Sequence, residues 1–418
     1  MIGRRKNRPR AGGASRALGA AAIALALALW QPGAAVADSQ FGTNGLGVGS
    51  MISHARGWGM GGLSTALDDS LRVSFSNPAL AAGQRQVSMA ILYAADRRRA
   101  EDTAGDTRYN SSTFPYFAFL VPMGSRLGLG FGYNLEQDLG SALTNSGVIA
   151  PGGDIPEHTR LFERSGSVFR VPGVVALRPH DNLHLGFRVD AFFANAEERF
   201  ELDFVESGIE TTEERVEISG RGTGGGFGVA WKLPPYLSVG VSYATSVTMN
   251  ASRRRVGMNG AVASRDIDIG FPERLSAGAT LRWNRFTLGG EVTQARWEDL
   301  DDTEQLAPLG GYQDVTEWGV GFEFAEDHFG PFLGRFPWRA GFRSSPLSYL
   351  TLEGETIDHY SFTIGSGFNL GRGGFCDLAL EYGLLGDAST VGLEENYYRF
   401  VVGFSGQEPW RKRKSYID

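Results

Sequence analysis

The 418-residue sequence contains a single cysteine, Cys376, and this scarcity excludes two classes of site. One thiol cannot form a disulfide framework or supply the clustered thiolates of a cysteine-based zinc or iron–sulfur centre. Past the amino terminus, no stretch reaches the roughly 18 consecutive apolar residues of a transmembrane helix. Walker A, Gly-x-Ser-x-Gly and His-Glu-x-x-His motifs are also missing from the sequence. We therefore expect no enzyme, with no catalytic residues, no cofactor and no metal site.

Basic residues are also in short supply. Forty Lys and Arg stand against 47 Asp and Glu, and six of the basic residues lie within the first 16 positions. The rest of the chain is strongly acidic, which excludes a general nucleic-acid binder, because such proteins need an excess of Lys and Arg. Glycine is abundant instead, with 58 residues, about twice its usual share. Together with 11% aromatic residues, this composition favours β structure.

The first 37 residues have the form of a secretory signal peptide. A basic segment precedes an apolar run over 17–30, which is short for a membrane span. Ala35-Val36-Ala37 then matches a cleavage site, so that Asp38 begins the mature chain. These features predict export from the cytoplasm.

From about residue 86 the sequence alternates between apolar and small or polar residues. Leu185, Phe187 and Val189, for example, alternate with Gly186 and Arg188. A period of two is typical of a β-strand that has one apolar face. We predict fourteen strands, at 86–94, 113–121, 126–136, 167–178, 183–194, 223–233, 236–247, 273–283, 286–297, 313–325, 336–346, 357–370, 374–386 and 395–405.

The lengths of the strands and loops distinguish two folds that share this alternation. A soluble sandwich buries its apolar faces, whereas an outer-membrane barrel turns them to lipid. The predicted strands mostly reach the roughly 9–11 residues that a tilted membrane-spanning strand needs. Short turns alternate with long loops, among them 137–166, 195–222 and 248–272. The sequence therefore predicts an all-β transmembrane barrel, antiparallel and up-and-down, with about 14 strands; a soluble secreted β-protein is the alternative.

Aromatic residues cluster near the predicted strand ends. Trp231, Trp283 and Trp338 lie there, as do Tyr397 and Tyr398. Trp and Tyr rings prefer the lipid headgroup level, which favours interfacial belts. Aromatic residues that close the ends of a small sandwich are the other interpretation.

Residues 38–85 lack clean strand alternation and are predicted to form a hatch inside the barrel. The segment is rich in glycine and has only scattered apolar residues, so it needs surrounding walls to bury them. Asn77-Pro78 is a typical turn initiator. The following Ala79-Leu80-Ala81-Ala82 is expected to form a short helix, with Pro78 in its first turn.

Three motifs resemble the FadL/TodX-type outer-membrane transporter family. The segment from Ala55 to Leu80 is similar to the amino-terminal hatch, whose pattern runs Arg, Gly, small, acidic, Asn-Pro-Ala. Residues 272–274, the following hairpin and 294–297 resemble a second motif, and 338–342 a third. With the strand count, the resemblance covers most of the mature chain. It implies uptake of long-chain fatty acids or other hydrophobic molecules across the bacterial outer membrane.

The resemblance also implies candidate site residues. In the family a kink in the third strand opens the wall sideways, and here that strand carries Gly128, Gly130 and Gly132. These glycines form the kink, or allow close packing of the hatch, or merely fit the lumen. The implied hatch or gating residues, whose alternative roles are a structural turn or plain solvation, are Asn77, Pro78, Ala79, Arg56, Asp68 and Asp69.

The carboxyl end departs from the family pattern. The barrel is predicted to span 86–405, and a basic periplasmic tail follows at 406–418 instead of a terminal aromatic residue. This tail leaves open a resemblance to PorV-type barrels, which serve protein secretion or envelope assembly. Expected partners are hydrophobic small molecules, outer-membrane lipid and lipopolysaccharide, and the outer-membrane assembly machinery. An acidic outer loop at 206–217 is expected to be solvated or to hold divalent cations with lipopolysaccharide.

Overall fold

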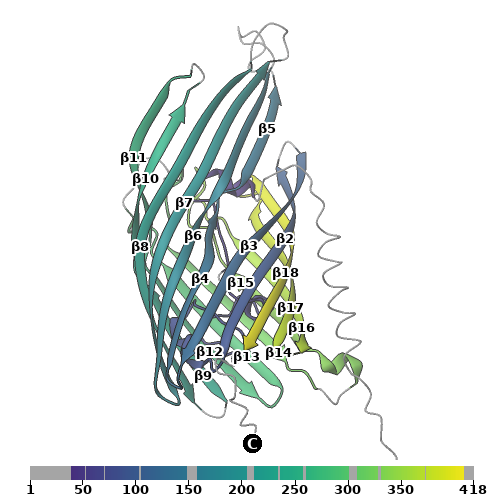
Figure 1. Cartoon of the computed structure of the whole chain (residues 1–418). Helices are drawn as coiled ribbons and strands as arrows, with labels where there is room; N and C mark the ends of the chain where they lie inside the picture. The colour runs from purple at the N-terminus through teal and green to yellow at the C-terminus, as the bar shows by residue number, and fades with distance from the viewer. Residues whose placement is uncertain are drawn as a thin grey trace, which may run out of the picture.

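The computed structural model describes residues 39–51, 53–69, 71–102, 105–147, 158–204, 211–233, 236–257, 260–300, 308–327, 331–371 and 373–408. The predicted signal peptide at 1–37, and the tail beyond residue 408, lie outside them. Within the described residues, the strands form one antiparallel sheet that closes on itself because β18 pairs with β2 (Figure 1). No helix in this part of the chain is long and apolar enough to cross a membrane.

The hatch and the wall are distinct in the structure. The hatch contains η1 (Gln40–Thr43), β1 (Val48–Gly49), α2 (Ala55–Trp58) and η2 (Pro78–Gly83). The wall contains β2 (Val87–Asp102), β3 (Gly105–Met123), β4 (Leu127–Asp138), β5 (Ser141–Gly147), β6 (His158–His180), β7 (Leu183–Phe204), β8 (Thr212–Leu233), β9 (Leu237–Ala244), β10 (Val247–Val256), β11 (Val262–Phe271), β12 (Arg274–Trp283), β13 (Phe286–Ala295), β14 (Val315–Phe324), β15 (Trp338–Ser344), β16 (His359–Gly371), β17 (Gly374–Asp387) and β18 (Leu393–Glu408).

The described strands make fourteen passes through the wall, which confirms the predicted fold and strand number. Three passes are interrupted, so that β4 continues as β5, β9 as β10 and β11 as β12. At the last of these breaks stands Pro272, which has no backbone N–H to donate to a neighbouring strand. Short turns lie at the end where the described chain finishes, and the taller strands rise at the other end (Figure 1).

The wall is inverted relative to a soluble protein. On β7, Phe187 and Val189 are 58% and 71% exposed, whereas the intervening Arg188 and Asp190 are 4% and 1% exposed. Apolar side chains turned outward and ionic side chains turned inward are expected when lipid surrounds the barrel. The sandwich alternative is therefore wrong, and the chain is a transmembrane barrel of the bacterial outer membrane.

The strands rise further on the outer side than the alternation predicts. Parts of the loops predicted at 137–166, 195–222 and 248–272 are strand, in β5–β8, β10 and β11. Beyond the lipid belt these strands carry charge instead of an apolar face, so the alternation disappears while the backbone ladder continues. In place of apolar contacts, ion pairs join neighbouring strands, as between Arg254 and Glu217 at 3.0 Å. Glu213, Glu214 and Glu217 of the predicted acidic loop thus belong to β8.

Candidate functional site

The hatch enters the lumen as a chain of short turns with local caps. His54 precedes α2, and its Nδ1 accepts the N–H of Gly57 at 3.0 Å. Asn77 precedes η2, and its Oδ1 accepts the N–H of Ala79 at 3.0 Å. Pro78 occupies the first turn of η2, where the missing N–H costs nothing. The helix predicted after Asn77 is therefore present, as a 3-10 helix.

Six buried charged residues join the hatch to the wall in a closed ring. Arg56 donates to both oxygens of Glu323 on β14, at 2.7 and 2.9 Å, and to Asp69 at 2.9 Å. Three arginines thus alternate with three carboxylates, half from the hatch and half from the wall. In order around the ring they are Arg56, Asp69, Arg72, Asp377, Arg339 and Glu323.

The ring has no net charge, and every member has two oppositely charged neighbours. Side-chain exposure ranges only from 1% to 8%. Burial alone would raise the pKa of Asp69, but Arg72 and Arg56 outweigh it and hold this pKa far below its usual range. Removing one partner from such a set leaves an uncompensated buried charge. This lowers the free energy of unfolding much more than the loss of an exposed ion pair does.

The start of the hatch is held by further wall side chains near β17 and β18. Glu395 is fully buried and accepts the hydroxyl of Ser39 at 2.8 Å, together with the Tyr109 hydroxyl. Trp58 donates its indole N–H to Glu381, which also accepts the Tyr397 hydroxyl. The hatch is therefore bound to the wall along its length.

The predicted hatch residues fall into three places. Arg56 and Asp69 meet in the ring, whereas Asp68 lies apart and pairs with Lys232 of β8 at 2.7 Å. The turn formed by Asn77, Pro78 and Ala79 packs on the lumen face of β7 and β8. There the side-chain amide of Asn77 donates to the carbonyl of Val229 at 3.1 Å.

Glycines on the wall make this approach possible. A Cβ at Gly186 would overlap the backbone of Pro78, and a Cβ at Gly228 would overlap the Asn77 side chain. Glycine is the residue that allows such close contact.

The third-strand glycines lie under the hatch. A Cβ at Gly128 would touch the carbonyl of Ala81, and a Cβ at Gly130 would collide with the Phe75 ring. Phe75 also lies above Gly132. The register of β4 against β6 shifts between Leu135 and Gln137, on the outer side of the glycines. These glycines therefore allow close packing of the hatch, whereas their role in a kink stays a prediction.

The wall divides next to the register shift in β4. The β3–β4 ladder ends at the pair Tyr116 and Asn134. Beyond it β3 continues outward against β2, while the end of β4 turns to the hatch and pairs with β1. A small pocket of about 30 Å³ lies in this division, lined in part by Ser111, Thr113 and Leu135.

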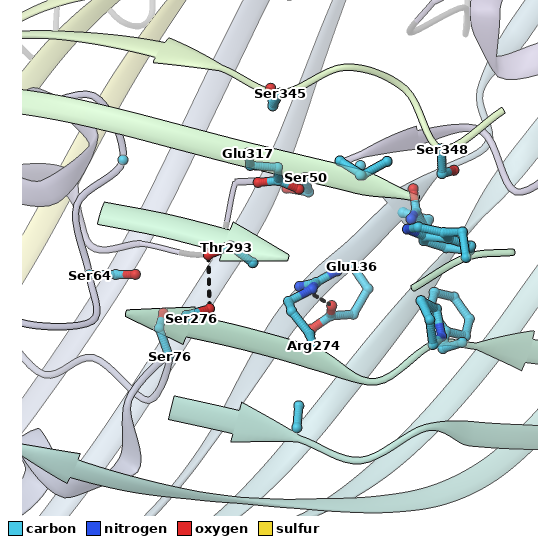
Figure 2. Close-up of a pocket in the computed structure, with 18 of the residues that line it drawn as sticks. Ser50, Ser64, Ser76, Glu136, Arg274, Ser276, Thr293, Glu317, Ser345 and Ser348 are labelled. Carbon is cyan, nitrogen blue, oxygen red and sulfur yellow. Dashed lines mark hydrogen bonds and ion pairs between the residues drawn. The ribbon is translucent and has the colours of Figure 1, made fainter. Parts of the chain in front are cut away.

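A larger cavity of about 160 Å³ lies between hatch and wall (Figure 2). Part of its lining is a cluster of apolar side chains, those of Phe192, Val247, Phe271, Trp297 and Val315. The lining also carries charged side chains, among them Glu136, Arg170, Arg188, Arg274 and Glu291.

Within this cavity the ionic groups differ in how firmly they are held. Arg188 donates to Asp190 at 2.8 Å and to the carbonyl of Phe75, with 3% of its side chain exposed. Arg274 reaches across the lumen to Glu136 at 3.7 Å and is 29% exposed (Figure 2). Arg274 is therefore the more available cation for a ligand.

Sequence reasoning found Arg56 and Asp69 of the ring but missed Arg72 and the whole wall side. Glu323, Arg339 and Asp377 were not expected as site residues. One signal in the sequence could have found these three residues. Each is a charged residue at a strand position that faces the lumen, where a small or neutral residue would be enough to build the strand.

Residues 20–416 match the family model described as BamG. The solved structures that resemble the chain include the Ralstonia pickettii toluene transporter TbuX, at 16% identity and TM-score 0.58, covering 85% of this chain and 98% of that one. A Pseudomonas aeruginosa FadL homologue has 14% identity and TM-score 0.60, with 87% and 100% covered. The P. putida toluene transporter TodX has 17% identity and TM-score 0.57, with 87% and 100% covered. No protein of curated function matches. The predicted likeness to FadL/TodX-type barrels is confirmed at the level of fold.

Breaking the ion ring should loosen the hatch. Arg56→Met leaves Glu323 and Asp69 short of a cation in a buried site, so we expect a loss of about 3–5 kcal/mol. Lys232→Met is the matched control: it breaks the part-exposed pair with Asp68 and should cost less than about 1 kcal/mol. Urea unfolding in lipid vesicles measures both. Equal, small losses would show that the ring contributes little.

The hatch should weaken in mild acid through His54. Burial lowers the pKa of this imidazole to about 4, opposed by Asp69. An unfolded histidine binds a proton near pH 6.5, whereas the folded one does not, so stability is lost as pH falls from 6.5 toward 4. The loss should reach at most about 3 kcal/mol. His54→Asn keeps a capping oxygen without titrating, and should flatten this part of the urea-midpoint profile; an unchanged slope would assign the loss to other groups.

Proposed function

The chain belongs to the BamG family and folds as a plugged outer-membrane barrel, and from this premise we propose that it carries hydrophobic molecules with a polar head group across the membrane. The observation that carries the proposal is the cavity lining, which combines an aromatic cluster with charged side chains. The printed descriptions of TbuX and TodX as toluene transporters support transport of hydrophobic compounds as the general activity.

The cavity lining favours an amphipathic ligand over a pure hydrocarbon. The chain or ring of the ligand would pack on Phe192, Phe271 and Trp297, which already contact one another through Phe271 at 5.8 and 5.9 Å. A carboxylate would reach Arg274, whose present pair with Glu136 is long. Charge-assisted hydrogen bonds of this kind are stronger than neutral ones and fix ligand orientation. A long-chain fatty acid has both parts.

The size of the cavity limits how much ligand it holds. An apolar cavity of about 150 Å³ is large enough for benzene, and pockets for larger organic ligands usually reach roughly 300–1,000 Å³. At about 160 Å³, this one accommodates the head-group end of a long molecule. The remaining chain would have to extend toward the outer side.

We place the exit at the division between β3 and β4. The ion ring and the Asn77–Ala79 turn fill the periplasmic end of the lumen, whereas the β3–β4 ladder stops at Tyr116. Phe114 is 60% exposed beside this point and packs on Tyr93 at 5.1 Å. Such an aromatic pair suits the headgroup level, so the proposed lateral release is into that layer.

The ligand proposal is tested by direct binding. A fluorescent long-chain fatty acid and its methyl ester are titrated into the protein in detergent, with Arg274→Gln and Phe271→Ala variants. We expect Arg274→Gln to weaken the acid about tenfold, as for the loss of one charge-assisted hydrogen bond, and to leave the ester unchanged. Phe271→Ala should weaken both.

The control for the binding test is Lys232→Met, which removes a cation that does not line the cavity. Its affinity for both ligands should equal that of the unmodified protein. Equal losses of acid and ester in Arg274→Gln would contradict the assignment of the head group. No binding of either ligand to the unmodified protein would contradict the transport proposal.

A second candidate function is a barrel that serves a secretion or envelope assembly machine. One observation favours it: the hatch is fixed by six buried charged residues, which suits a closed scaffold. This function predicts a stable complex with such a machine, recovered by gentle detergent extraction, and no saturable binding of the fatty acid.

A further inference from the structure

One periplasmic connection differs from the others. The described turns at 124–126, 181–182 and 284–285 are two or three residues long. The connection between Phe324 and Trp338 is longer and contains η3 (Phe332–Arg335). Figure 1 shows this segment projecting sideways from the barrel at the end with the short turns.

Specific contacts hold the connection in place. The indole N–H of Trp338 donates to the carbonyl of Leu333 at 3.0 Å, and the N–H of Asp327 donates to the carbonyl of Gly334 at 2.6 Å. Arg285, from the neighbouring turn, donates to the carbonyl of Ala325 at 2.7 Å. These hydrogen bonds therefore hold the connection in a defined conformation relative to the barrel.

Its tip presents apolar side chains to its surroundings. Phe332 and Leu333 are 57% and 64% exposed, and Phe332 packs edge-on against Phe336 at 5.4 Å. Trp338, which anchors the tip, is 48% exposed on the face of β15 that turns to lipid. The apolar tip thus continues the lipid-facing surface of the barrel.

We propose that residues 331–338, the β14–β15 anchor, insert into the periplasmic leaflet of the outer membrane. A Trp ring prefers the headgroup boundary, and an apolar turn beside it lies at the depth where interfacial segments bury their apolar residues. Continuity with the lipid-facing wall identifies phospholipid as the occupant. A second copy of the chain or another protein would have to displace that lipid.

The anchor also has a structural consequence for the hatch. Trp338 faces outward, and the next residue, Arg339, faces inward and belongs to the ion ring. Glu323, also in the ring, is the second-last residue of β14 and lies just before the same connection. Lipid contact on the outside therefore fixes the hairpin that supplies two of the three wall charges on the inside.

Site-directed spin labelling tests the anchor. In a Cys376→Ala background, single cysteines are introduced as Leu333→Cys and, in the short turn at 181–182, as Asp181→Cys. Both proteins are labelled and placed in phosphatidylethanolamine–phosphatidylglycerol nanodiscs, which leave both faces open. Asp181 is the matched control, because its side chain is 88% exposed in a polar periplasmic turn.

We expect the label at 333 to collide with oxygen several times more often than with a neutral nickel chelate, and the label at 181 to show the reverse. Nickel accessibility at 333 equal to that at 181 would place the tip in water and overturn the proposal. Protection from both reagents would show a protein cover and would also overturn it. Heat-dependent gel mobility confirms that each variant is folded.

Discussion

A carboxylate that is buried inside a barrel surrounded by lipid needs a cationic partner from the protein itself. This constraint determines how the hatch and the wall fit together. Asp377 and Glu323 project inward from the wall and are almost fully buried. Moving such charges away from water costs several kcal/mol each unless they are paired. Arg56 and Arg72 of the hatch supply that pairing together with Arg339. The hatch thus supplies charges that neutralise those of the wall. The interior of the barrel, filled by the hatch, serves as the core of the protein.

The same balance decides what the lumen is able to do. The ring and the Asn77 turn fill the periplasmic part, and the larger cavity lies next to them, lined by the aromatic cluster and Arg274. The wall, in contrast, loosens on the outer side, where the β3–β4 ladder ends. A tightly held lower half and a divided upper half favour capture from outside and sideways release over passage straight through.

Much of the fold could be predicted from the sequence. Each spanning strand has one face toward lipid and one toward the lumen, and this imposes a period of two on its residues. The fourteen passes and the turn at Asn77-Pro78 follow from that period and from turn chemistry. The outer extensions could not be predicted in the same way, since Arg254 and Glu217 pair across strands without any apolar face. The ring was also missed, because Asp69 and Asp377 are more than 300 residues apart and nothing local shows that they share Arg72. Sequence shows which strand faces carry charge, but not which charges meet.

The most direct test of the fixed hatch is hydrogen–deuterium exchange of the intact protein in detergent micelles. If the ring holds the hatch in the lumen, the amides of residues 53–69 should exchange as slowly as those of β14 and β17, because they open only with the barrel itself. Complete exchange of these hatch amides within seconds, while the wall strands stay protected, would contradict the account.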